Sequence, residues 1–149
     1  MRLINPASRS SGFTLVEVLV TVVIFSVGLL GLAGLQATGI KLNHSSLLRS
    51  QATLLAYDII DCMRANQGKN KANLPDYAIA MDDNPPTTAT NQADRDIINW
   101  IDSLAKNLPS GDGSVTFPTT NRAEVIVQWD DARTGDPTRF KSMTVVTDI

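Results

Sequence analysis

The fold is decided by residues 10–36, SSGFTLVEVLVTVVIFSVGLLGLAGLQ. From Val18 to Leu35 this stretch runs for eighteen residues without a charged side chain. At a rise of about 1.5 Å per residue, a helix of this length covers roughly 27 Å, which is close to the thickness of a bilayer's hydrocarbon core. The stretch therefore predicts a membrane-spanning helix near the amino terminus.

Two features at the start of this stretch need an explanation. Glu17 places a carboxylate near the end of an otherwise apolar span, where it is costly unless it has a partner or a function. The second feature is the boundary between Gly12 and Phe13, where a short basic leader meets the apolar run. A secretory signal peptide has its small-residue cleavage site beyond the apolar run. Cleavage after Gly12 would instead leave the helix on the chain.

Gly12, Phe13, Thr14, Leu15 and Glu17, in this spacing, resemble the type III signal of type IV pilins and pseudopilins. The resemblance implies that a membrane peptidase cuts after Gly12 and methylates the new amino terminus at Phe13. It also implies that Glu17, the fifth residue of the mature chain, neutralises the amino terminus of a neighbouring subunit. An opposite charge at about 4–6 Å favours the ionised carboxylate. The alternative is a plain signal anchor in which Glu17 reaches the membrane interface.

Composition limits the other possibilities. The chain has 149 residues and a formal charge of −2, which becomes −4 when Arg2 and Arg9 leave with residues 1–12. An acidic chain does not favour electrostatic binding to nucleic acid, and we expect no nucleic-acid partner. The single cysteine, Cys62, excludes a disulfide within the chain. We expect its side chain to pack as a small apolar residue rather than to pair with another molecule.

One very long helix is predicted from Phe13 to about Asn66, after a leader at residues 1–12. Residues 13–40 form its transmembrane and assembly half, and residues 41–67 form its amphipathic half, with Gly68 as the stop signal. The apolar stripe of the second half needs a cover, which a sheet from later in the chain can provide. The stripe comprises Leu48, Ala52, Leu55, Ile59 and Met63, broadened by Leu47, Leu54 and Cys62.

Residues 68–149 predict an α/β unit made of a loop, a helix and strands. Residues 68–93 are rich in asparagine, proline and threonine, which predicts an exposed loop with a brief ordered piece at 77–81. The second helix is expected at 94–107, with Asp94 as N-cap or first-turn acid and an apolar stripe of Ile97, Ile98, Ile101, Leu104 and Leu108. Strands are expected at 114–117, 123–129 and 140–147. Either face of the last strand suits burial. The prediction is an α+β pilin fold, with a small antiparallel sheet on the long helix.

The sequence offers no catalytic constellation, and we expect neither an enzyme nor a cofactor. His44 is the only histidine, and Cys62 is distant in sequence, so a zinc site is not expected. The run DDARTGD, residues 130–136, invites comparison with a calcium loop. Aligned in that way, however, it places Ala132 and Lys141 where oxygen ligands belong. A solvated hairpin turn is the better interpretation.

A more selective resemblance extends over residues 28–66, GLLGLAGLQATGIKLNHSSLLRSQATLLAYDIIDCMRAN. This run, and Trp100 followed by LPSGDGSV, is similar to the PilV group of minor pilins, also described as type IV pilus modification proteins. The resemblance implies a minor pilin that primes or caps a type IV pilus. Its partners would be other minor pilins, the pilus assembly machinery and prepilin peptidase.

The same resemblance implies a location in the inner membrane, with a single pass and the carboxy-terminal domain in the periplasm. From there the protein would be incorporated at or near the pilus tip. The alternative is an I-type pseudopilin of type II secretion, which shares the GLLGLAGLQ style of anchor. An adhesin or DNA-uptake tip subunit is a third hypothesis, although no basic or aromatic patch calls for it.

Overall fold

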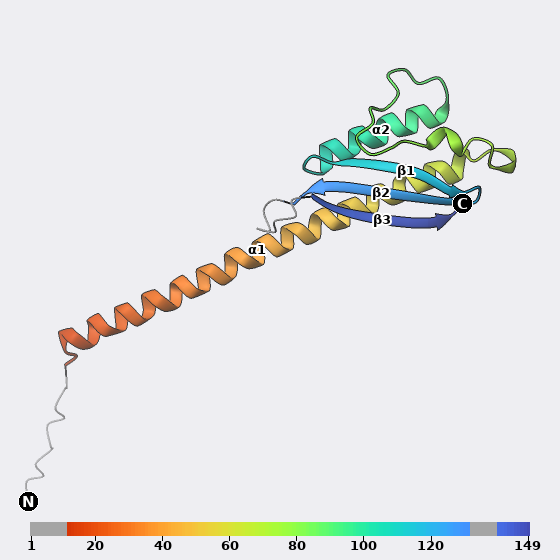
Figure 1. The fold of residues 1–149 in the computed structure, drawn as a ribbon. Coiled ribbons are helices and arrows are strands. Elements are labelled where there is room, and N and C mark those ends of the chain that lie inside the picture. The colour runs from red at the N-terminus through yellow and green to blue at the C-terminus, as the bar shows by residue number, and fades with distance from the viewer. Residues whose placement is uncertain (1–11, 132–139) are drawn as a thin grey trace, which may run out of the picture. The chain divides into compact units, whose positions relative to one another are not determined.

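In a computed structural model of the chain, the structure describes residues 12–131 and 140–149. The chain divides into two compact units, residues 1–40 and residues 41–149. The elements appear in Figure 1 and comprise α1 (Leu15–Asn66), η1 (Lys69–Lys71), η2 (Pro75–Tyr77), α2 (Gln92–Asn107), β1 (Asp112–Thr119), β2 (Arg122–Asp130) and β3 (Phe140–Asp148). A long helix with an apolar amino-terminal part and a small antiparallel sheet confirm the predicted α+β pilin-like architecture.

Helix α1 has recognisable signals at both ends. At its start, the Thr14 hydroxyl accepts a hydrogen bond from the backbone N–H of Glu17 at 3.3 Å, as an N-capping side chain does. Two residues beyond its end, Gly68 has a φ of 67°, a left-handed conformation that glycine adopts without strain. The predicted end of the long helix near Asn66 is therefore confirmed.

The part of α1 in the second unit buries one face. The five residues of the predicted stripe are buried there, and so are Ala56 and Ile60. The prediction that Leu47 and Leu54 broaden the stripe is wrong, because their exposed fractions are 54% and 69%. The reason is geometric. Seven residues apart, Leu47 and Leu54 lie on one line of the helix, and neither belongs to the buried face that Ala56 and Ile60 extend.

The sheet has the order β1-β2-β3 and is antiparallel throughout. Its central strand β2 supplies the most buried row, formed by Ala123, Val125, Val127 and Trp129. On β3, Lys141, Met143, Val145 and Thr147 are half-buried and alternate with exposed residues, which decides the question that the sequence left open. The Thr53 hydroxyl of α1 lies 3.1 Å from the Met143 sulfur, so this row of β3 faces the helix.

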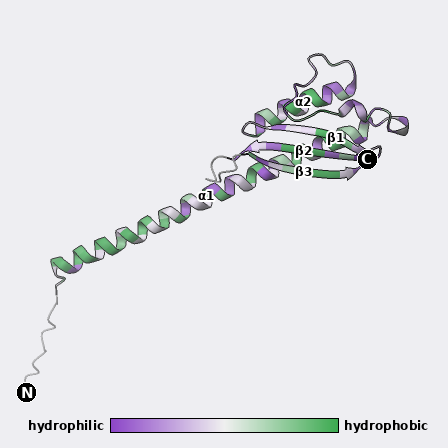
Figure 2. Ribbon diagram, viewed as in Figure 1, coloured by the Kyte–Doolittle hydropathy of each residue, from purple (hydrophilic) through white to green (hydrophobic). Residues whose placement is uncertain are grey.

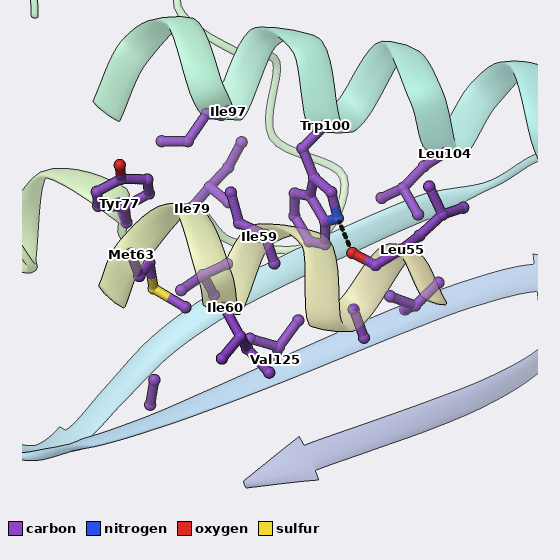
Figure 3. Close-up of a cluster of buried hydrophobic side chains, with 14 of the residues drawn as sticks. Leu55, Ile59, Ile60, Met63, Tyr77, Ile79, Ile97, Trp100, Leu104 and Val125 are labelled. Atoms are coloured by element: carbon purple, nitrogen blue, oxygen red, sulfur yellow. Dashed lines mark hydrogen bonds between the residues drawn. The ribbon is translucent and has the colours of Figure 1, made fainter. Parts of the chain in front are cut away.

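Helix α2 covers the core through Ile97 and Leu104 of the predicted stripe, and also through Ala93 and Trp100, which the predicted stripe did not include. Its capping box uses Asn91 and Asp94, so Asp94 is the third helical residue and the helix begins at Gln92. Trp100 is 4% exposed, and its indole N–H donates to the backbone oxygen of Leu55 at 2.8 Å (Figure 3). Ile98 and Ile101 are only half-buried, because Trp100 rather than Ile101 occupies the centre of the contact with α1.

Glycines make room for this contact. A Cβ on Gly113 of β1 would lie 2.5 Å from the Trp100 ring, and one on Gly111 would lie 2.3 Å from the backbone oxygen of Leu104. Both distances are shorter than any real Cβ contact. The SGDGS turn therefore allows α2 and β1 to pack closely.

The segment between α1 and α2 is not simply an exposed loop, which corrects the prediction for residues 68–93. Leu74, Tyr77 and Ile79 are buried, and Ile79 forms a bridge with Val115 of β1. In Figure 3, Tyr77 and Ile79 lie among the core side chains. The bridge at Ile79 confirms the brief ordered piece predicted at 77–81. The burial of this segment was not predicted, because turn-forming residues dominate its composition. Of the run 130–136, Asp130 and Asp131 are described, and residues 132–136 lie outside the described residues.

Candidate membrane-anchoring and subunit-association site

The first unit presents apolar side chains around the whole helix. Figure 2 shows this part of α1 as hydrophobic, and none of the residues in its most apolar window is buried. Among the described residues, α1 is the one helix long and apolar enough to cross a membrane. The exposed side chains include Leu15, Val18, Val22, Phe25, Leu29, Leu32 and Leu35. A surface of this extent requires lipid or other apolar helices as its surroundings.

The hydroxyl groups of this segment are satisfied within the helix. Thr21 donates to the backbone oxygen of Glu17 at 2.7 Å, and Ser26 donates to that of Val22 at 2.7 Å. Thr38 donates to the backbone oxygen of Gly34 at 3.0 Å. Each bond spans four residues, so the hydroxyl group does not need a partner from outside the helix. This segment is therefore compatible with a hydrocarbon environment.

Phe13 and Glu17 lie together at the start of the helix. Both line one shallow depression with Val18, Thr21 and Val22, and the Phe13 residue is 83% exposed. Gly12 precedes them, and a Cβ on Gly12 would meet no atom within 4 Å. The three predicted site residues thus lie in one exposed segment at the start of α1.

Glu17 is the single ionisable residue between Gly12 and Ile40. Ion pairs in the described part of the chain join Arg64 to Asp61, Lys106 to Asp102 and Arg122 to Asp148, and none is recorded for Glu17. Within residues 12–131 and 140–149, Glu17 therefore has no ion-pair partner. Its carboxylate is available to a cation from another molecule.

The comparison with protein families adds one finding. Residues 7–33 match the model of the prokaryotic N-terminal methylation motif, and the match includes Gly12, Phe13 and Glu17. Neither the curated proteins nor the solved structures gave a match. The motif, together with the α+β architecture, defines a type IV pilin-like protein.

Proteins with this motif are structural subunits, and the motif implies cleavage by prepilin peptidase followed by assembly into a pilus or a pseudopilus. The apolar helix of this pilin-like chain fits a single-pass membrane anchor.

The second unit contains the two residues singled out from the sequence as possible metal ligands, His44 and Cys62. His44 is half-buried, and among the described residues no cluster of His, Cys, Asp and Glu side chains could hold a metal ion. Cys62 is half-buried against the core. Burial raises the pKa of the Cys62 thiol, and nearby carboxylates, Asp96 foremost, raise this pKa further. A protonated thiol is a weak nucleophile, so a packing role suits Cys62.

The packing roles of two aromatic residues in the second unit, Trp100 and Tyr77, were not predicted from the sequence. Besides Trp100, the Tyr77 hydroxyl donates to a carboxylate oxygen of Asp96 at 2.5 Å and accepts from the Asn66 amide at 3.1 Å. Burial and the bond to Asp96 raise the pKa of Tyr77. This contact fixes η2 between the end of α1 and the start of α2. An isolated aromatic within a polar segment was the available signal.

Proposed function

We propose that this chain is a minor pilin of a type IV pilus, which primes or caps pilus assembly together with other minor pilins. The observation that carries the proposal is the exposed apolar segment of α1, which follows Gly12–Phe13 and holds one carboxylate, Glu17, with no ion-pair partner among the described residues. A helix of this kind suits lateral packing with similar helices. Its second, compact unit can select neighbours through a surface of its own.

Each of the three site residues has a role in this proposal. Prepilin peptidase cuts between Gly12 and Phe13, and the exposure of both residues supports access to this bond. The new amine at Phe13 is methylated and carries a positive charge. Glu17 of one subunit pairs with this amine of its neighbour inside an apolar bundle. Since breaking a buried ion pair leaves an uncompensated charge, the pair favours a correct axial stagger between subunits.

The proposal also assigns a location to each part of the chain. Residues 1–12 are removed, residues 13–40 span the inner membrane before assembly, and residues 41–149 lie in the periplasm. The similarity of residues 28–66 to the PilV group of minor pilins supports a position at or near the pilus tip. The partners are then other minor pilins and the assembly machinery.

An I-type pseudopilin of type II secretion is the second candidate. One observation supports this pseudopilin function equally well: the matched segment, residues 7–33, lies entirely in the part of the chain that pilins and pseudopilins share. The test is to purify the tagged full-length protein from solubilised membranes of its own host and to identify by mass the subunits that accompany it. Recovery of minor pilins of a pilus supports the first function. Recovery of secretion pseudopilins supports the second, and recovery of neither overturns both.

A further inference from the structure

The outer edge of β3 has backbone groups that are oriented for pairing with another strand. In an antiparallel ladder, each residue directs its N–H and C=O groups to one side, and successive residues alternate. Val115 of β1 exchanges hydrogen bonds of 2.9 and 3.1 Å with Ile79, so its groups point away from β2. Val125, opposite Val115, then directs its groups towards Val145 of β3.

This alternation determines the direction in which the backbone groups of each β3 residue point. Met143, Val145 and Thr147 pair with β2, whereas Ser142, Thr144 and Val146 direct their N–H and C=O groups outwards, away from β2. No strand of the described chain pairs with this side, because β3 ends the sheet order β1-β2-β3. The outer edge, defined as Ser142, Thr144 and Val146, is therefore open.

This edge has few of the features that usually protect a sheet edge. Natural edge strands are protected by proline, by bulges or by charged side chains, including ones that point inwards, and β3 has one such charge on its helix-facing row, at Lys141. The pairing of β3 with β2 runs without a register shift from Asp148 to Phe140, and Ser142, Thr144 and Val146 carry neither charge nor proline. The opposite edge of the sheet differs. On β1, the outward N–H and C=O groups of Val115 are hydrogen-bonded to Ile79. The register of β1 shifts after Thr116, and Pro118 follows.

The face of β3 towards α1 is also incompletely covered. Val125 and Val127 on β2 are 0% exposed, whereas their partners Val145 and Met143 on β3 are only half-buried. The difference arises because β2 has a strand on each side and β3 has a strand on one side only. A further strand with apolar side chains on its helix-facing side would cover Met143 and Val145.

The direction of β3 argues against a second copy of this chain as the partner. Thr53 contacts Met143 and Arg64 contacts Thr147, so β3 runs in the same direction as residues 41–66 of α1. Antiparallel pairing of two β3 strands would make these helices run in opposite directions. The proposed packing of helices side by side, with Glu17 of one subunit at the Phe13 amine of the next, requires helices that run in the same direction. Two β3 strands paired in parallel by exact two-fold symmetry would place each outward N–H opposite the same N–H of the other copy. Hydrogen bonds in a parallel ladder require the two strands to be offset by one residue, which this symmetry does not allow. The β1 edge of a copy is occupied.

We propose that the outer edge of β3 binds an extended segment of a different filament subunit, one with apolar side chains at alternate positions. The class of partner rests on the proposed function, and the binding mode rests on the open edge. Main-chain hydrogen bonds would supply affinity, and the cover over Met143 and Val145 would supply selectivity. Because β1 is closed, the sheet extends on one side only. Each copy of this chain therefore accepts one such partner.

The test compares proline with alanine at Thr144 in the full-length protein, expressed in its own host. Thr144→Pro deletes an outward N–H and leaves the pairing with β2 intact, and edge strands tolerate proline at such a position. Thr144→Ala removes the side chain but keeps the donor. Proline should reduce recovery of the partner subunit about tenfold, since a lost hydrogen bond and a steric clash act together, while alanine should leave recovery close to wild type.

A second pair, Val146→Pro and Val146→Ala, guards against a folding defect at one site, and resistance to protease confirms that each variant is folded. Hydrogen exchange in the purified assembly gives an independent readout: the amides of Ser142, Thr144 and Val146 should be protected, and this protection should be lost in Thr144→Pro. If folded proline variants recover the partner as well as the alanine variants, this inference is overturned while the minor-pilin function stands. A wild-type protein that recovers no other subunit overturns both.

Discussion

Replacement of Glu17 gives the sharpest test of how this subunit associates. Glu17 is the only ionisable side chain from Gly12 to Ile40, and it has no ion-pair partner in the described part of the chain. If its carboxylate pairs with a neighbour's amine in an apolar bundle, Glu17→Val leaves that amine buried and uncompensated. Breaking a buried pair in this way costs about 3–5 kcal/mol, which corresponds to roughly a hundredfold to a few thousandfold weaker association.

Membrane insertion should not suffer from this change, because a charge within the span opposes insertion. The variant should therefore be cleaved and resident in the membrane, yet fail to recruit its partner subunits. Glu17→Gln keeps the shape and removes the charge, so it should show nearly the same loss. Thr21→Val is the matched control, since Thr21 lines the same depression and its hydroxyl is bonded within the helix.

The assay expresses each variant in a strain without the native gene. It scores amino-terminal cleavage, recovery of the partner subunits and surface pili. Normal pili with normal partner recovery in Glu17→Val would refute the pairing and would favour a plain signal anchor. Loss of cleavage would show that the peptidase recognises Glu17. In that case, expression of the variant directly in its mature form would isolate the association step.

Three further predictions concern processing, packing and pH. The intact mass of the membrane protein should correspond to a chain that begins at a methylated Phe13, and Gly12→Val should block cleavage. A wild-type protein that retains residues 1–12 would contradict this. Trp100→Phe should lower the free energy of unfolding by about 2–3 kcal/mol through the lost bond to Leu55 and the space left behind, as measured by urea denaturation of the detergent-solubilised chain. Burial raises the pKa of Tyr77 in the folded chain, so the neutral side chain contributes to the free energy of unfolding. This contribution should be fully present below about pH 10, the usual tyrosine pKa, and should be lost as the pH rises above that value. Tyr77→Phe should reduce this alkaline loss, and an unchanged slope would contradict the role of burial.

The sequence alone determined the features that arise from local patterns. The uncharged run Val18–Leu35 fixed the apolar part of α1, because helix length and composition are sufficient to recognise such a segment. The buried stripe from Leu48 to Met63 followed from a period of about 3.6 residues. Gly12, Phe13 and Glu17 were recognised from their spacing in the sequence, and the match over residues 7–33 includes the same positions. Their roles remain predictions.

Only the tertiary structure decided which contacts cross between distant segments. Leu54 is as apolar as Leu55, yet Leu54 is exposed and Leu55 is buried, because the sheet and α2 cover only part of the helix circumference. Tyr77 lies in a segment of turn residues, and its burial depends on Asn66 and Asp96, both remote from it in sequence. The open edge of β3 depends on the pairing register. Alternation along a strand says which residues share a face, but the neighbouring strand determines which N–H and C=O groups remain unpaired.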